Sequence, residues 1–426
     1  MPIRSNQMSF RPYLLGILAF ATVFLFWGTS VQAQATADFT AWKDPQNAEA
    51  VPGWARLMLT RDFRNVTGAA REELLAKTLS ALKGIASDSN VVPSTRYNAI
   101  LAAGQLVSRE PTPGNPPIAY PAALTYLIEV YQNLDSPHYL KYGALLGIVR
   151  HAHIGIDLDL QDKVIDLLLE TVTTEFESGE ITLETVPLEP AAWDWFRLTA
   201  LDGLAALRTI GTNGKVVTEL LSVINRQSRE LEDLIDSQYM FTREEWELSR
   251  RFSELASKAA KTLGDLNYAE PTDIDTRKMT DAFIRLTKAI CDIAHKMATD
   301  FIELTERDGL SPHPALLLER IVVNLKICTQ SVVWGIRSSF LTGRPTEDSF
   351  YASLESDDPS IRRLDILLTE IIRLATFLDE GDGTRRPILS ANVPREFQFN
   401  LSELRDVLTT TSEVLTEILR EEEETL

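Results

Sequence analysis

Helical periodicity constrains this chain more than any other feature of its sequence. From about residue 71 onward, apolar residues recur three and four positions apart, as in LQDKVIDLLLETV (160–172) and SIRRLDILLTEIIRLATFL (360–378). This spacing places apolar side chains on one face of an α-helix, and a sustained strand-like alternation is hard to find. Hydrophobic residues make up 44% of the 426 residues, enough to bury a core, so the sequence predicts an all-α fold.

A short pattern recurs along the first part of this helical region. Each copy carries small and aliphatic residues three and four positions apart, and the copies align on Ala99, Ala144, Ala200 and Ala260 at spacings of 45, 56 and 60 residues. Second, more aliphatic segments lie between the copies. A helix pair of this kind resembles the unit of HEAT-type repeats, which is about 40–47 residues long. The resemblance implies a HEAT-like α-α superhelical stack over residues 71–268; an irregular helical bundle is the alternative.

A second helical region follows a polar, proline-bearing stretch at 267–275 that is typical of a linker. Two long amphipathic segments come first, joined by a turn near 307–314, and they are expected to form an antiparallel hairpin. Two further helices are predicted at about 360–379 and 400–420. The sequence therefore predicts a C-terminal helical bundle over residues 276–426.

The start of the chain has the composition of a targeting segment. Basic residues precede an apolar run at 13–27, and small residues follow at Val31 and Ala33. This order predicts a signal peptide over residues 1–33, and an uncleaved membrane anchor is the alternative. In either case the rest of the chain, beginning with an N-terminal extension at 34–70, is predicted to be exported. The expected location is periplasmic or secreted, or anchored to the inner membrane if the segment is retained.

The charge of the chain limits its partners. It has 42 lysine and arginine residues against 61 aspartate and glutamate residues, a formal net charge of −19. Binding to phosphate backbones and to anionic membrane surfaces needs clustered basic residues, so no nucleic-acid partner is predicted. A membrane contact is expected only if residues 1–33 stay uncleaved. The acidic surface is interpreted as a solvated one that keeps an exported protein soluble.

Two cysteines, Cys291 and Cys328, lie 18 residues before Gly309 and 18 residues after Leu310, the two residues of the predicted turn. Residues equidistant from the turn of a helical hairpin lie at the same height. Export would place them where a disulfide persists. A bridge between them is one hypothesis, and two buried free thiols are the other.

One cluster has the composition of a metal site. His151, His153, Asp157 and Asp159 fall within nine residues, and histidine and carboxylate are common zinc ligands. The alternative is structural: the histidines stand at the end of a helix, where the helix dipole favours them, and an aspartate caps the next helix. The structural interpretation is preferred, and no metal or other cofactor is predicted.

No catalytic signature stands out in the sequence, which lacks G-x-S-x-G, H-E-x-x-H and C-x-x-C. The leading hypothesis is therefore a non-enzymatic helical scaffold or protein-interaction module of the cell envelope. Its expected partner is a protein or an envelope component. The alternative is an α-helical envelope enzyme, acting for example on polysaccharide, whose acidic residues gather in a cleft with Trp193 and Trp195.

Overall fold

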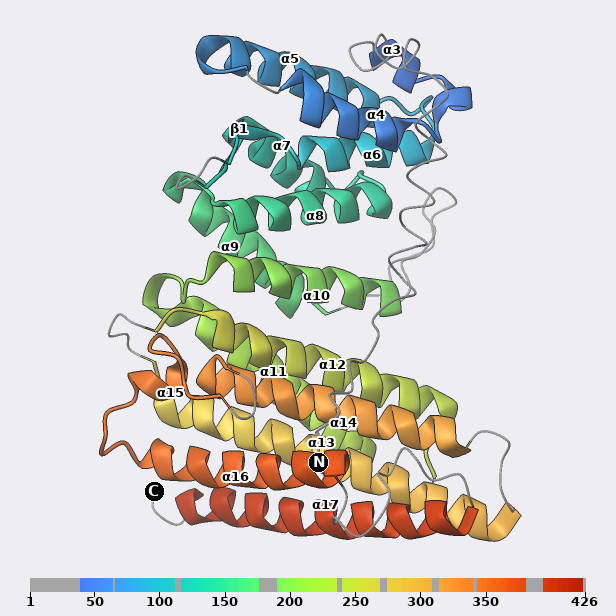
Figure 1. Cartoon of the computed structure of the whole chain (residues 1–426), viewed down its shortest axis with the longest axis vertical. Helices are drawn as coiled ribbons and strands as arrows, with labels where there is room; N and C mark the ends of the chain where they lie inside the picture. The colour runs from blue at the N-terminus through green and yellow to red at the C-terminus, as the bar shows by residue number, and fades with distance from the viewer. Residues whose placement is uncertain are drawn as a thin grey trace, which may run out of the picture. The chain divides into compact units, whose positions relative to one another are not determined.

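The structure is a computed structural model, and helices account for nearly all of its ordered elements (Figure 1). It describes residues 39–63, 66–111, 116–175, 190–235, 240–268, 274–308, 314–339, 343–380 and 394–423. Within these ranges the only strands are β1 (Val107–Arg109) and β2 (Ile118–Ala119), which pair antiparallel. The all-α prediction is confirmed. The superhelical HEAT-like arrangement stays a prediction.

Tertiary contacts divide the chain into two compact units, one ending at Gly147 and the other beginning at Ile148. The division falls inside one helix, α8. The described helices of the first unit are α3 (Phe39–Trp42), η1 (Pro45–Asn47), α4 (Val51–Leu57), η2 (Met58–Asp62), α5 (Gly68–Ala86), α6 (Pro93–Ala103), α7 (Pro121–Gln132) and most of α8 (His138–Ile154).

The predicted N-terminal extension, residues 34–70, is described from Phe39 and contributes to the core of this first unit. Trp42 and Val51 are both 0% exposed. The predicted signal peptide, residues 1–33, lies outside the described residues. Within the described ranges, no helix combines the length and the apolar character needed to cross a membrane.

The second unit contains the remaining helices. They are the end of α8, α9 (Leu158–Thr173), α10 (Pro190–Leu207), η3 (Thr212–Gly214), α11 (Lys215–Ile235), α12 (Arg243–Asp265), α13 (Thr276–Asp308), α14 (Pro314–Arg337), α15 (Phe350–Ser353), α16 (Pro359–Glu380) and α17 (Pro394–Glu423). The helix predicted at about 360–379 matches α16, and the helix predicted at about 400–420 lies within the longer α17.

The alanines that align the repeated pattern occupy the expected environment. Ala99, Ala144, Ala200 and Ala260 are all 0% exposed. A methyl group is the smallest side chain that fills such a position, so neighbouring helices pack closely around it. All four alanines are therefore core residues of their helices, and their role in close helix contact stays a prediction.

The helices on either side of the predicted linker share one core. Helix α14 contacts its hairpin neighbour α13, but it packs more extensively on α12, and α13 packs most extensively on α17 and α11. In Figure 1, α12 and α14 lie side by side. The stretch at 267–275 therefore lies within the second unit. The predicted turn residues Gly309 and Leu310 lie outside the described residues.

Candidate functional site

The four predicted metal-ligand candidates are not brought together. His151 is 0% exposed, whereas His153, Asp157 and Asp159 are exposed. Both histidines stand in the last turn of α8, as the structural alternative expects. Asp157 occupies the N-cap position of α9, although its side chain accepts no capping hydrogen bond. Among the described residues, no cluster of three or more histidine, cysteine, aspartate or glutamate side chains has the arrangement of a metal site.

Both cysteines are free thiols in the structure, and each is 0% exposed. The Cys328 thiol contacts the Ser253 carbonyl oxygen at 3.9 Å and the Asn324 side-chain oxygen at 3.7 Å. Burial raises the pKa of Cys291 well above its ordinary value and raises the pKa of Cys328 to about 12. Such thiols are protonated and inert at neutral pH.

A thiol count tests the two hypotheses for the cysteines. We expect the purified, non-reduced protein to react with two equivalents of a thiol reagent in denaturant, and with almost none under native conditions, because burial blocks both thiols. Absence of reactive thiols in denaturant, with two appearing after reduction, would instead establish the bridge between Cys291 and Cys328.

A groove with a volume of about 1360 Å³ runs along α12 in the second unit. It is lined by side chains of α10, α12, α13 and α14, and by Phe241 just before α12. Its apolar lining includes Leu198, Trp246, Met297, Phe301, Ile321, Val323 and Ile327, and its charged lining is Asp202, Arg243, Glu247, Arg250, Glu254, Lys258, Lys261 and Arg320. Apolar walls with charged residues among them are typical of binding sites.

The groove follows from how α12 and α14 approach each other. They run parallel, since the thiol of Cys328 meets the carbonyl of Ser253 and, further along both helices, Ser338 Oγ donates to the Gly264 carbonyl at 2.6 Å. Near Gly264 the two backbones touch: a Cβ on Gly264 would lie 2.8 Å from the Cα of Gly335. The groove runs beside these contacts, from Arg243 and Trp246 near the start of α12 to Lys261, about one turn before Gly264.

The sequence of α12 sets the orientation of its groove-lining face. Thr242 caps the helix: its hydroxyl accepts from the Glu245 backbone N–H at 3.2 Å, and the Glu245 carboxylate accepts from the Thr242 N–H at 2.6 Å. This capping box fixes the first turn. Groove residues then recur at three- and four-residue steps from Arg243 to Lys261. At 1.5 Å per residue this face is about 27 Å long, or five helical turns.

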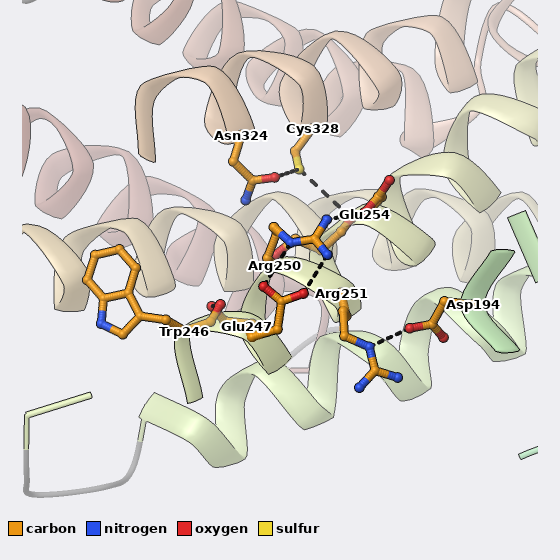
Figure 2. A network of polar contacts seen from close by, with 10 residues as sticks. Asp194, Trp246, Glu247, Arg250, Arg251, Glu254, Asn324 and Cys328 are labelled. Atoms are coloured by element: carbon orange, nitrogen blue, oxygen red, sulfur yellow. Dashed lines mark hydrogen bonds and ion pairs between the residues drawn. The ribbon is translucent and has the colours of Figure 1, made fainter. Parts of the chain in front are cut away.

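Most charges in the groove neutralise one another. The Arg250 guanidinium donates to Glu247 at 2.6 Å and to Glu254 at 2.7 Å (Figure 2). The hydrogen bond from Arg250 is the main cause that lowers the pKa of the Glu247 carboxyl below its ordinary value. Lys258 pairs with Asp202 across to α10. The Glu247 carboxylate is thus held in its ionised form.

Two arginines at the N-terminal end of the groove differ from the others. Arg243 is the first residue of α12, and Arg320 on α14 lies near enough for its charge to lower the pKa of Glu247. Neither arginine forms an ion pair within the described part of the chain. The unpaired charges of the groove lining at this end are therefore positive, and Glu244 and Glu245 of the same turn lie outside the lining.

Two aliphatic side chains of α14 face the groove instead of the core. Ile327 is 54% exposed and Val323 is 42% exposed, whereas the main apolar stripe of the helix, which includes Leu325 and Cys328, is buried. Both residues lie off that stripe, so the apolar periodicity of the sequence does not identify them as part of a site. Large aliphatic side chains outside the buried stripe of an amphipathic helix are the one signal that points to them.

The tryptophans of the enzyme hypothesis do not line this groove. Trp193 stacks on Phe196 with ring centroids 5.4 Å apart and donates through Nε1 to the Thr174 carbonyl at 3.2 Å. Trp195 is 64% exposed. Between them, Asp194 pairs with Arg251 of α12 at 2.5 Å (Figure 2), which ties α10 to α12.

The comparisons with known proteins give no family for the chain: no family model, no curated protein and no solved structure matches it.

Proposed function

We propose that this protein is an exported, non-enzymatic interaction module of the cell envelope that binds a partner protein through the α12 groove. The observation that carries the proposal is the exposure of Ile327 and Val323 in a hollow of about 1360 Å³. Water-exposed aliphatic side chains in a concave surface cost free energy that a partner recovers by covering them. The export part of the proposal rests on the sequence of residues 1–33 alone.

The dimensions of the groove favour a helical segment as the bound element. Small-molecule sites usually measure about 300–1000 Å³, and this groove is larger. An elongated face of about five turns suits an amphipathic helix that buries its apolar side between two helices. The residues that form the face come from four helices of one compact unit, so the surface is held by the core beneath it.

The carboxylates of the groove support binding over catalysis. Glycoside hydrolysis needs one carboxylic acid with a raised pKa to protonate the leaving oxygen. Here Arg250 bonds both Glu247 and Glu254, and the pKa of Glu247 is lowered. Trp193 and Trp195 lie outside the groove lining as well. The polysaccharide-enzyme alternative therefore has no favourable observation in this site.

Site-specific photocrosslinking tests the proposal. With a photoreactive amino acid in place of Ile327, we expect irradiation of native cells to give one adduct of defined mass, because a bound partner covers this position. Leu158, which is 82% exposed on α9, is the matched control and should give no such adduct.

A second substitution makes the result specific to the groove. Val323→Glu places a charge in the apolar lining and is expected to abolish the adduct at position 327, with the helical content of the protein unchanged by circular dichroism. Equal adducts at positions 327 and 158, or an adduct that persists with Val323→Glu, would contradict the proposal.

A further inference from the structure

We infer that the partner segment is an acidic amphipathic helix whose carboxylates lie against Arg243 and Arg320 at the N-terminal end of the groove. This inference rests on the proposed function and adds to it the charge and the orientation of the bound helix. It follows from three features of the site: the local charge, the distribution of unpaired cations, and the position of the exposed aliphatic residues.

The groove is a positive region of an acidic protein. Its lining contains five basic and three acidic side chains, a net charge of +2, whereas the whole chain carries −19. Complementary charge steers association and suppresses wrong partners. The net negative charge of the whole chain disfavours adhesion to anionic lipid.

The unpaired cations are confined to one end of the groove. Arg250 is neutralised by two glutamates, and Lys258 and Lys261 are paired with Asp202 and Asp265. Arg243 and Arg320 form no ion pair with any described residue. Arginine binds carboxylate through parallel N–H donors, so these two side chains are suited to acidic side chains of a partner.

Arg243 is the first residue of α12 and lines the groove, whereas Glu244 and Glu245 of the same turn do not belong to the lining. Val323 and Ile327 of α14 follow Arg320 by roughly one and two turns. A bound helix therefore places its acidic residues at Arg243 and Arg320 and its apolar stripe on Val323 and Ile327.

A peptide library tests the inference directly. The library is a set of 18-residue helices with a fixed leucine stripe and flanking positions randomised among glutamate, lysine and glutamine. After selection on the full chain, we expect the ratio of glutamate to lysine near one end of the peptide to rise at least about tenfold, corresponding to about 1.4 kcal/mol. No enrichment, or enrichment of lysine, would overturn the inference.

Charge reversal supplies the matched comparison. The double variant Arg243→Glu, Arg320→Glu is expected to invert the selected charge, whereas Arg229→Glu, an exposed α11 arginine outside the groove, should leave the glutamate preference unchanged. Raising the salt concentration should weaken binding of the selected acidic peptide, since partly exposed charges are screened. Equal selection by the wild type and the double variant also counts against the inference.

Two further measurements separate the possible failures. The first is sedimentation of the chain with phosphatidylglycerol vesicles. If the wild type sediments with them and the Arg243→Glu, Arg320→Glu variant does not, the two arginines bind a lipid surface and not an acidic helix, and the inference is overturned. If the library shows no charge preference while the photocrosslink at position 327 persists, only the acidic chemistry fails. Loss of the crosslink itself overturns the proposed function.

Discussion

Replacing Gly264 with alanine is expected to destabilise the second unit by about 3 kcal/mol, the upper part of the usual range for overpacking. The added Cβ would lie 2.6 Å from the carbonyl carbon of Trp334 and 2.8 Å from the Cα of Gly335. These are backbone atoms of α14, which cannot rotate away as a side chain can. The two helices must therefore separate along their length.

The sign of this effect is decided by two opposing contributions. Alanine favours a helix over glycine by about 1 kcal/mol, so without the contact the substitution would stabilise α12. Gly84 provides that comparison, because it lies on an exposed turn of α5 and a Cβ there would meet nothing within 4 Å. We expect Gly84→Ala to stabilise the first unit slightly, by about 0.5–1 kcal/mol.

Urea denaturation followed by circular dichroism and tryptophan fluorescence measures both variants. Gly335→Ala should behave like Gly264→Ala, since its Cβ would lie 2.5 Å from the Ala260 carbonyl oxygen. A midpoint for Gly264→Ala at or above that of the wild type would show that α12 and α14 do not touch at this point. The groove between them would then need another explanation.

The sequence predicts helices well in this chain because their signal is local. The apolar periodicity predicts α16 to within one residue at each end, whereas α17 begins at Pro394, six residues before its predicted start. Asp358, a residue type that commonly caps helices, directly precedes the first residue of α16, Pro359. The buried alanines, including Ala200 and Ala260, were also predicted from spacing alone. Each of these features depends on residues within about two turns of one another.

The packing partners of the helices could not be read in the same way. A short turn predicts that α14 packs on α13, but α14 packs more extensively on α12, where its backbone meets Gly264, about 70 residues earlier in the chain. A glycine inside a helical pattern indicates that another helix approaches closely at that position, but it does not show which helix. The groove was missed for the same reason, since it exists only where side chains of four helices meet.

The surroundings of charged residues in the fold are equally hard to predict from the local sequence. Glu247 of α12 is exposed, as expected for a charged residue on an amphipathic helix, and it lines the groove. That this exposed face is concave depends on neighbours such as Arg320, which lies on another helix. Local charge pattern therefore predicts exposure but not which exposed face is concave.

The second unit is expected to lose stability steeply above pH 9 when its cysteines are kept reduced. Both thiols are 0% exposed, and burial raises their pKa, that of Cys328 to about 12. In the unfolded chain a thiol ionises near pH 8.5. Between these values the folded protein holds a proton that the unfolded chain has released, so the free energy of unfolding falls as pH rises.

The expected slope of the free energy of unfolding against pH follows from the number of protons that the folded chain retains and the unfolded chain has released. Each thiol contributes about 1.4 kcal/mol per pH unit in this window, and the two together about 2.7 kcal/mol per pH unit. This is a large part of the usual 5–15 kcal/mol stability of a folded protein. We therefore expect unfolding in mild denaturant to begin between about pH 9 and 10, measured as the urea midpoint at successive pH values with a reductant present.

Substitutions separate the thiols from other groups that titrate in alkali. Cys291→Ala with Cys328→Ala should remove most of the slope between about pH 9 and 10, even if the double variant is less stable at every pH. Tyr268 is also fully buried with a raised pKa, but a tyrosine in the unfolded chain ionises only near pH 10. Tyr268→Phe should therefore leave the lower window unchanged and reduce the slope only above it. An identical slope in the wild type and the double cysteine variant would mean that the thiols are not buried in protonated form.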